Sequence, residues 1–208
     1  MTGIFGRIGE ERELRTVYRK ASQGVIDKAL PALDVHCRHF IELSPFLCIG
    51  TSRPDGTADV SPRGGENGFV HILDDGHLAL PDRPGNNRLD TLTNILHSPA
   101  VGLLFFIPGI NEMLRVNGTA AISTEPALME RFVVGGKPPL SVMVVTIQEA
   151  FLHCTKALVR SELWNPERHV PRDRLPSFGQ MIRDQLKLMV PAMLIQAGLK
   201  KDERDNLY

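Results

Sequence analysis

The segment Leu80–Arg88, which reads LPDRPGNNR, holds the residues best suited to bind an anion. Its order predicts a strand end, a turn through two prolines and a glycine, and a helix that begins at Asn87. The first turn of a helix has free backbone N–H groups, and its macrodipole favours negative charge. The guanidinium groups of Arg83 and Arg88 match phosphate oxygens, and the Asn87 amide can also donate. The segment predicts a phosphate site; a capped helix with solvent-exposed arginines is the alternative.

A second candidate anion site is the sequence Ser61-Pro62-Arg63-Gly64-Gly65, which we expect at the end of a strand. Gly64 lets a ligand approach the backbone, Pro62 removes a donor from the strand ladder, and Arg63 can reach an anion. The hairpin pattern places this strand end near the first segment. A strand-terminating turn without a ligand is the alternative.

A third group of functional side chains lies at the end of the last predicted strand, Val142–Thr155. Lys156 and Arg160 could hold a second anionic or electron-rich group, and Trp164 could stack on a planar ring. These residues therefore indicate a ligand with both charge and an aromatic surface.

The cysteines and histidines predict neither a metal site nor a nucleophile pair. The three cysteines, Cys37, Cys48 and Cys154, are far apart and form no CxxC pair, so a disulfide framework is not expected. Ligation by His36, Cys37, His153 and Cys154 does not follow the usual zinc spacings. Neighbouring strand residues point to opposite faces, so His153 is not expected to activate Cys154. We expect no metal and a reducing, cytoplasmic compartment.

The elements that must position these residues are mainly strands. Residues 7–43 have a helical pattern, interrupted by Pro31, that predicts two helices. Short apolar runs then alternate with turn signals, and Asp75-Gly76 is expected to supply a positive φ to a hairpin. This spacing, with one inserted helix at Asn87–His97, predicts a small antiparallel barrel. The predicted strands are Phe46–Thr51, Thr57–Ser61, Phe69–Leu73, His77–Leu80, Ala100–Ile107, Leu114–Ile122 and Val142–Thr155. A helix is expected over Phe178–Leu199, followed by a frayed charged tail, Lys200–Arg204.

Composition and charge exclude several classes of protein. The chain has 208 residues, with 24 Lys and Arg against 24 Asp and Glu. A nucleic-acid partner is not expected, because binding phosphate backbones needs a local basic excess. Nor is a membrane partner expected: no run approaches the ~20 apolar residues of a span, and Met1–Lys20 lacks the apolar core of a signal peptide. The marks of dinucleotide-fingerprint proteins, P-loop NTPases, α/β-hydrolases and zincins are missing from the sequence.

Taken together and in order, these segments resemble the pyridoxamine 5'-phosphate oxidase-like superfamily of FMN-binding split barrels. The similarity is greatest to an uncharacterised bacterial branch with SPRG, PDRPGNxR, LRVNG and HCxKA motifs. Here these motifs are Ser61–Gly64, Pro81–Arg88, Leu114–Gly118 and His153–Ala157, and the resemblance covers about residues 40–168. It implies a mainly β fold with flanking helices: an antiparallel split β-barrel, dimeric. The expected units are an N-terminal helical segment (1–43), an FMN-binding barrel (44–168) and a C-terminal helical extension (169–208).

The resemblance also implies a cofactor and its contacts. FMN would lie at the interface of a homodimer, with Arg63, Asn87 and Arg88 on its phosphate and backbone groups near Gly64, Leu80 and Pro81 along its ring. The partner subunit would contribute near Met113 and Arg115, although a polar residue is more usual than Met113 at that position. The late Trp and Arg pattern that grips substrate in true pyridoxamine phosphate oxidases is missing, so that specific activity is not expected. The full set of expected cofactor-binding residues is Ser61, Pro62, Arg63, Gly64, Leu80, Pro81, Asp82, Arg83, Asn87, Arg88, Met113, Arg115, Lys156 and Trp164.

Three functions remain open from the sequence. The first is an FMN-dependent oxidoreductase that moves hydride or electrons between flavin and a small molecule; the flavin would supply the redox chemistry, so no catalytic side chain is required. The second is a carrier or sensor that binds flavin or another anionic planar ligand without turnover. The third is a structural dimeric barrel with an emptied site. FMN and a deazaflavin are not distinguished.

Overall fold

Two hairpins form the two edges of the sheet, as their turn sequences predict. The first pairs β1 (Phe46–Ser52) with β2 (Ala58–Gly64) in the computed structural model, which describes residues 8–208. Gly56 adopts a φ of 83° in its turn, where a side chain would be strained. The first seven residues of the predicted N-terminal segment lie outside the described part of the chain.

The second hairpin pairs β3 (His71–Asp74) with β4 (His77–Asp82). Gly76 does not take the positive φ expected from its sequence. The Asp74 carboxylate instead accepts a hydrogen bond of 2.8 Å from the Gly76 N–H, so a side chain holds this turn.

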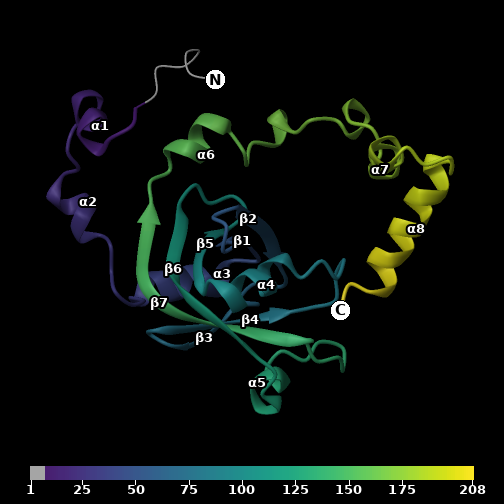
Figure 1. Cartoon of the computed structure of the whole chain (residues 1–208), viewed down its shortest axis with the longest axis horizontal. Helices are drawn as coiled ribbons and strands as arrows, with labels where there is room; N and C mark the ends of the chain where they lie inside the picture. Colours follow the sequence, from purple (N-terminus) through teal and green to yellow (C-terminus); the bar gives the residue numbers. More distant parts are fainter. Residues whose placement is uncertain (1–7) are drawn as a thin grey trace.

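All seven strands join one antiparallel sheet in the order β2-β1-β5-β6-β7-β4-β3, which curls into the split barrel (Figure 1). The remaining strands are β5 (Ala100–Phe106), β6 (Met113–Ser123) and β7 (Ser141–His153). The expected mainly β fold with flanking helices is confirmed. The last strand ends two residues before its predicted end, because His153 pairs with Met113, where β6 begins, and the chain then turns helical.

The core lies inside the barrel, where alternate strand residues point inward. In β1 the buried positions are Leu47, Ile49 and Thr51, and in β5 they are every second residue from Val101 to Phe105. Helix α3 (Val35–Leu43) packs Cys37, Phe40 and Ile41 onto this core.

Helix α4 (Asp90–His97) is the inserted helix expected from the sequence, and it lies against β1, β2 and β6. The Asn94 amide on α4 donates a buried hydrogen bond of 2.9 Å to the Thr51 hydroxyl, which fixes the helix to the sheet. Helix α5 (Pro126–Glu130), between β6 and β7, was not expected from the sequence.

The terminal helices differ from the predicted pattern. Among the described residues the N-terminal segment has three helices instead of two, α1 (Glu11–Val17), α2 (Gln23–Asp27) and α3. After β7 come α6 (Lys156–Ser161) and the short 3-10 turns Pro166–Arg168 and Arg172–Arg174. The single helix expected over Phe178–Leu199 is two, α7 (Phe178–Leu186) and α8 (Ala192–Asp205). Lys187, in the left-handed region at φ 52°, and Pro191 separate them.

The charged tail expected to fray is helical, because α8 continues to Asp205. Figure 1 shows α7 and α8 at the end of an arch that leaves the barrel at α6 and returns to it at the C-terminus. No helix within residues 8–208 has both the length and the apolar character needed to cross a bilayer.

Replacing Gly118 by alanine should destabilise the fold by at least about 2 kcal/mol. Gly118 lies at the bulge between β6 and β7, and a Cβ there would be 2.1 Å from the backbone oxygen of Thr146. The backbone must move to relieve this contact. Urea unfolding measures the effect, with Gly24→Ala on α2 as control because a Cβ there would meet no atom within 4 Å. Equal urea midpoints for the two variants would contradict the close backbone contact described at this bulge.

Candidate functional site

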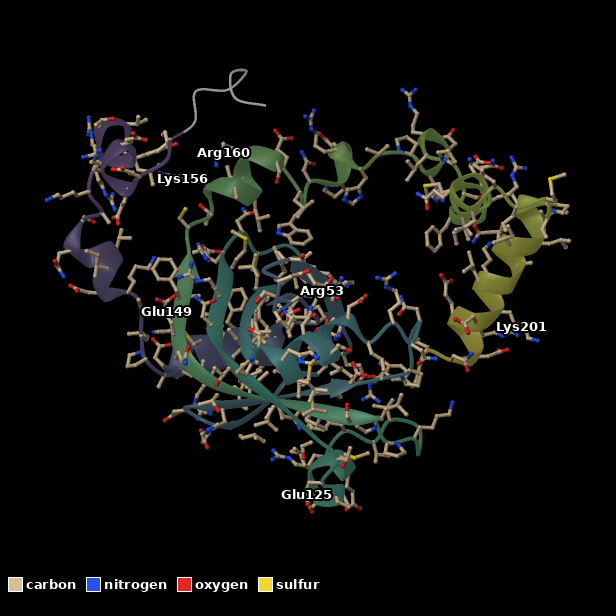
Figure 2. The ribbon with its side chains drawn as sticks, in the orientation of Figure 1. Arg53, Glu125, Glu149, Lys156, Arg160 and Lys201 are labelled. Atoms are coloured by element: carbon tan, nitrogen blue, oxygen red, sulfur yellow. The ribbon has the colours of Figure 1, made fainter. Side chains whose placement is uncertain are left out.

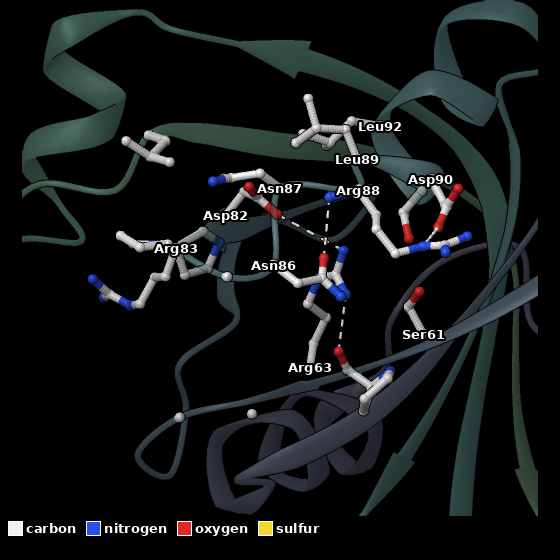
Figure 3. A pocket seen from close by; sticks show the side chains of 18 of the residues that line it. Ser61, Arg63, Asp82, Arg83, Asn86, Asn87, Arg88, Leu89, Asp90 and Leu92 are labelled. Atoms are coloured by element: carbon white, nitrogen blue, oxygen red, sulfur yellow. Dashed lines mark hydrogen bonds and ion pairs between the residues drawn. The ribbon is translucent and has the colours of Figure 1, made fainter. Parts of the chain in front are cut away.

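A cavity of about 730 Å³ opens between the end of β2, the end of β4 and the loop that leads into α4 (Figure 3). It brings together most residues of the two candidate anion segments, although they are about 20 positions apart in the sequence. Its lining residues from the predicted set are Ser61, Pro62, Arg63, Gly64, Pro81, Asp82, Arg83, Asn87 and Arg88. Apolar side chains complete the wall, among them Phe69, Leu92 and Leu140.

Strand β2 carries the first group of these residues. Ser61–Gly64 does not form a strand-ending turn, because β2 continues to Gly64 and Pro62 pairs with Cys48 of β1. Proline is tolerated there since β2 is an edge strand, where the missing N–H faces no neighbour. The strand therefore points Arg63 into the cavity on a regular backbone.

Arg63 is only partly satisfied by the protein. One terminal amino group donates to the carbonyl oxygen of Pro62 at 2.9 Å, and the other lies 3.7 Å from an Asp82 carboxylate oxygen. Its Nε is buried and has no hydrogen-bond partner among the described residues. The guanidinium of Arg63 thus makes one hydrogen bond and one looser ion pair within the chain, and its terminal amino groups retain capacity to donate to a ligand.

Asp82 faces Arg63 from the end of β4, and its side chain is only 15% exposed. Burial raises the pKa of this carboxyl group, and the nearby Arg63 charge opposes the rise. Asp82 thus reduces the positive field of Arg63 whenever it is ionised.

The loop before α4 departs from the predicted helix start. Asn87 and Leu89 both have a φ of 57°, and α4 begins at Asp90 with Leu89 as its N-cap. The Asn86 side-chain oxygen accepts a hydrogen bond of 3.1 Å from the Arg88 N–H, which holds the loop in a turn that competes with helix. Asn87 is therefore not a helix cap, and the expected cradle of first-turn N–H groups does not begin there.

This loop carries Arg88 to the mouth of the cavity. The Arg88 Nε donates to an Asp90 oxygen at 2.7 Å, and Arg53 lies 3.2 Å from the other oxygen. The hydrogen bond from Arg88 lowers the pKa of Asp90 and raises that of Arg88. The side chain of Arg88 is 70% exposed, and its two terminal amino groups bind no atom of the described residues. Two donor groups thus remain available at the cavity mouth.

Sequence reasoning missed Asn86, Asp90 and Arg53 as parts of this arrangement. Asn86 had a usable signal, because an Asn two residues before an N–H that needs a partner is typical of an Asx turn. Arg53 had none, since its contact with Asp90 joins residues 37 positions apart.

Five predicted residues do not line this cavity. Leu80 is fully buried in the core. Met113 and Arg115 lie on β6, where Arg115 pairs with Glu149. Lys156 is exposed on α6, as Figure 2 shows, and the Trp164 Nε1 donates to the Ile110 carbonyl oxygen at 2.8 Å.

His153 and Cys154 form no catalytic pair. His153 packs its ring edge-on against Phe151, with the centroids 5.1 Å apart, and Cys154 is exposed just after the strand. Burial, with the charges of Arg115 and Lys28, lowers the pKa of His153. No group of three or more potential metal ligands lies together within residues 8–208.

The sequence pattern of the pyridoxamine 5'-phosphate oxidase family matches residues 33–154, which is more than half of the chain. This match spans the whole sheet and both anion segments. The chain belongs to the pyridoxamine 5'-phosphate oxidase family. No curated protein matches the chain significantly.

Several solved structures are similar to part of this chain. HupZ from Group A Streptococcus has 17% identity and a TM-score of 0.49, covering 58% of this chain and 93% of HupZ. General Stress Protein 26 from Bacillus anthracis has 15% identity and a TM-score of 0.44, covering 55% and 88%. A pyridoxamine 5'-phosphate oxidase-related, FMN-binding protein from Nostoc punctiforme has 14% identity and a TM-score of 0.38, covering 54% and 75%. All three TM-scores are below 0.5, so membership in the family rests on the sequence match.

Proposed function

We propose that this protein binds FMN in the cavity between β2 and the loop before α4, and that it is an FMN-dependent oxidoreductase. The observation that carries the proposal is that Arg63 from β2 and Arg88 from the loop before α4 line one cavity. A phosphate dianion supplies the acceptors that these two arginines need. The family match and the resemblance to FMN-binding split barrels favour flavin as the molecule attached to that phosphate.

The rest of the cavity suits the remainder of FMN. Its volume of about 730 Å³ falls in the range of about 300–1,000 Å³ that is usual for small-molecule sites. The apolar side chains of Phe69, Leu92 and Leu140 offer surface to a planar ring. Bound flavin would supply hydride and electron transfer, while the protein binds it, orients it and excludes water.

We further propose a homodimer in which each flavin site receives residues from both subunits. Met113, Arg115, Lys156 and Trp164 do not line the cavity of their own chain. A twofold axis would bring one such group to each of the two cavities, because both partners present the same surfaces. In this arrangement residues 44–168 form the flavin unit, and the helical segments 1–43 and 169–208 flank it in a cytoplasmic protein.

The first test is the absorption spectrum and mass of any compound that copurifies with the protein. The proposal predicts flavin absorption and the mass of FMN. The mass of a deazaflavin would instead identify a deazaflavin as the cofactor of the same site. A protein that is colourless after incubation with FMN and removal of the free flavin would contradict the proposal. Steady-state oxidation of NAD(P)H or another donor then separates an oxidoreductase from a flavin carrier or sensor.

Replacing Asp82 by asparagine should strengthen FMN binding about three- to tenfold at pH 8, because a negative charge beside Arg63 is removed. The gain should shrink as the pH falls, since the carboxyl group of the wild-type protein becomes protonated, and burial moves that protonation to higher pH. Flavin fluorescence quenching measures both affinities across the pH range. Asp173→Asn removes the same charge from a residue that does not line the cavity and should have no effect. Weaker FMN binding by Asp82→Asn would show that the carboxylate assists the ligand.

A further inference from the structure

The segment after α8 returns to the barrel and reaches the cavity. Leu207 and Tyr208 line it beside Arg83, although they lie more than 100 positions further along the chain. Figure 1 shows the C-terminus next to the end of β4. The sequence alone gave no reason to associate these two residues with the anion segments.

Two basic side chains from separate loops hold Tyr208. The Lys137 Nζ donates to the backbone carbonyl oxygen of Tyr208 at 2.8 Å. The guanidinium carbon of Arg83 lies 5.0 Å from the centroid of the Tyr208 ring, within the range of a cation–π contact. Arg83 is itself fixed by a hydrogen bond of 2.9 Å to the Phe132 carbonyl oxygen. Arg83 is thus occupied by Tyr208 and by the segment just after α5, and Figure 3 shows it extending away from Arg63.

Leu207 and Tyr208 also line a second cavity of about 310 Å³, together with Val134, Gly135, Lys137, Arg204 and Asp205. Both residues are therefore shared between two cavities. Without the Tyr208 ring, the larger cavity would open on this side.

The helices that carry the tail are fixed to each other. The Gly179 N–H on α7 donates to the Gln196 side-chain oxygen on α8 at 2.9 Å. The two helices thus pack as a pair, and the contacts of Tyr208 with Lys137 and Arg83 hold the end of α8 to the barrel.

We infer that Leu207 and Tyr208 belong to the ligand site: they form a wall of the cavity, and Tyr208 retains the bound ligand and positions Arg83. The inference rests on the proposed FMN site and extends it to the C-terminal segment. The phosphate end of the cavity is charged, through Arg63 and Arg88, whereas the tail adds an aromatic and an aliphatic side chain. Such a cavity suits a ligand with an anionic group and a planar ring, because the arginines can bind the anionic group and the Tyr208 and Leu207 side chains can pack against the ring.

The full-length protein tests this through the dissociation of FMN, followed by stopped-flow fluorescence. Tyr208→Ala should release FMN about five- to tenfold faster, because an aromatic contact and a cation–π contact are lost. Tyr208→Phe keeps the ring and should stay within about twofold of wild type. Tyr18→Ala, the matched control, removes the other tyrosine of the chain, which is 62% exposed on the N-terminal segment. Unchanged release by Tyr208→Ala, or slower release, would overturn the inference while leaving the FMN site intact.

A second measurement works without FMN. With ¹³C-labelled tyrosine the chain gives ring signals from only two residues, and Tyr18→Phe assigns them. The Tyr208 signal should shift in Arg83→Ala and Lys137→Ala, and it should shift in wild type when FMN is added; the Tyr18 signal should not move. If the Tyr208 signal is unchanged in both Arg83→Ala and Lys137→Ala, Tyr208 does not form the proposed wall. If Tyr208 responds to both substitutions but wild type binds no FMN, the proposed function fails and the wall remains.

Discussion

Replacing Arg63 or Arg88 by alanine is expected to weaken FMN binding about 10- to 100-fold each, because a charged hydrogen bond contributes about 1.5–3 kcal/mol. The two arginines come from separate elements, β2 and the loop before α4, and line one cavity. The double variant should lose at least as much as the more damaging single substitution, since both act on one phosphate group. Isothermal titration with FMN measures each affinity.

Two controls distinguish a loss of phosphate contacts from general effects of the substitutions. Arg174→Ala removes an arginine from the arch that does not line the cavity, and it should bind FMN like wild type. Thermal unfolding without FMN shows whether Arg63→Ala still folds, because part of the Arg63 side chain is buried. If Arg88→Ala folds and keeps wild-type affinity, the anion site proposed here is wrong.

Mixing two variants that each bind FMN poorly should restore FMN binding at some sites if the partner subunit completes the site. Arg88→Ala damages the cavity, and Arg115→Ala damages the β6 group that we assign to the partner. A mixed dimer then has one cavity with both defects and one with none, as twofold symmetry requires. After equal amounts are unfolded together and refolded, about a quarter of all sites should bind FMN with wild-type affinity, because half of the dimers are mixed.

The alternative outcomes of the mixing experiment are distinct. If Arg115→Ala alone binds FMN normally, β6 contributes no contact to the flavin. If both variants are defective and the mixture recovers nothing, Arg115 acts within its own chain, where it pairs with Glu149. Sedimentation of each variant confirms that dimers are present.

Local signals in the sequence were sufficient for the hairpins and for most strands of the barrel. The Pro-Asp-Gly turn before β2 and the Asp-Asp-Gly turn before β4 predict both edge hairpins, because these residues favour turns by their own chemistry. Burial alternates along β1 and β5 although both are apolar runs, because successive strand residues point to opposite faces of the sheet. The start of α4 was misjudged, since Asn86 binds the Arg88 N–H and delays the helix to Asp90.

Long-range contacts explain what the sequence could not predict about the candidate site. The hairpin pattern and the family resemblance predicted that Arg63 and Arg88 lie close together, which the two segments alone do not encode because it depends on the order of strands in the sheet. The place of Tyr208 depends on the path of α7 and α8 and on Lys137, 71 positions away. Lys156 and Trp164 were grouped with the site by their types, yet they lie on or just after α6 and outside the cavity of their own chain.

Isothermal titration with FMN and with riboflavin isolates the contribution of the phosphate group, because the two molecules differ only by that group. We expect one FMN to bind per chain, with an affinity at least about tenfold higher than that of riboflavin. We also expect Arg63→Ala and Arg88→Ala to reduce this preference. Equal affinities for FMN and riboflavin in the wild-type protein, or binding of neither, would contradict the proposed phosphate site.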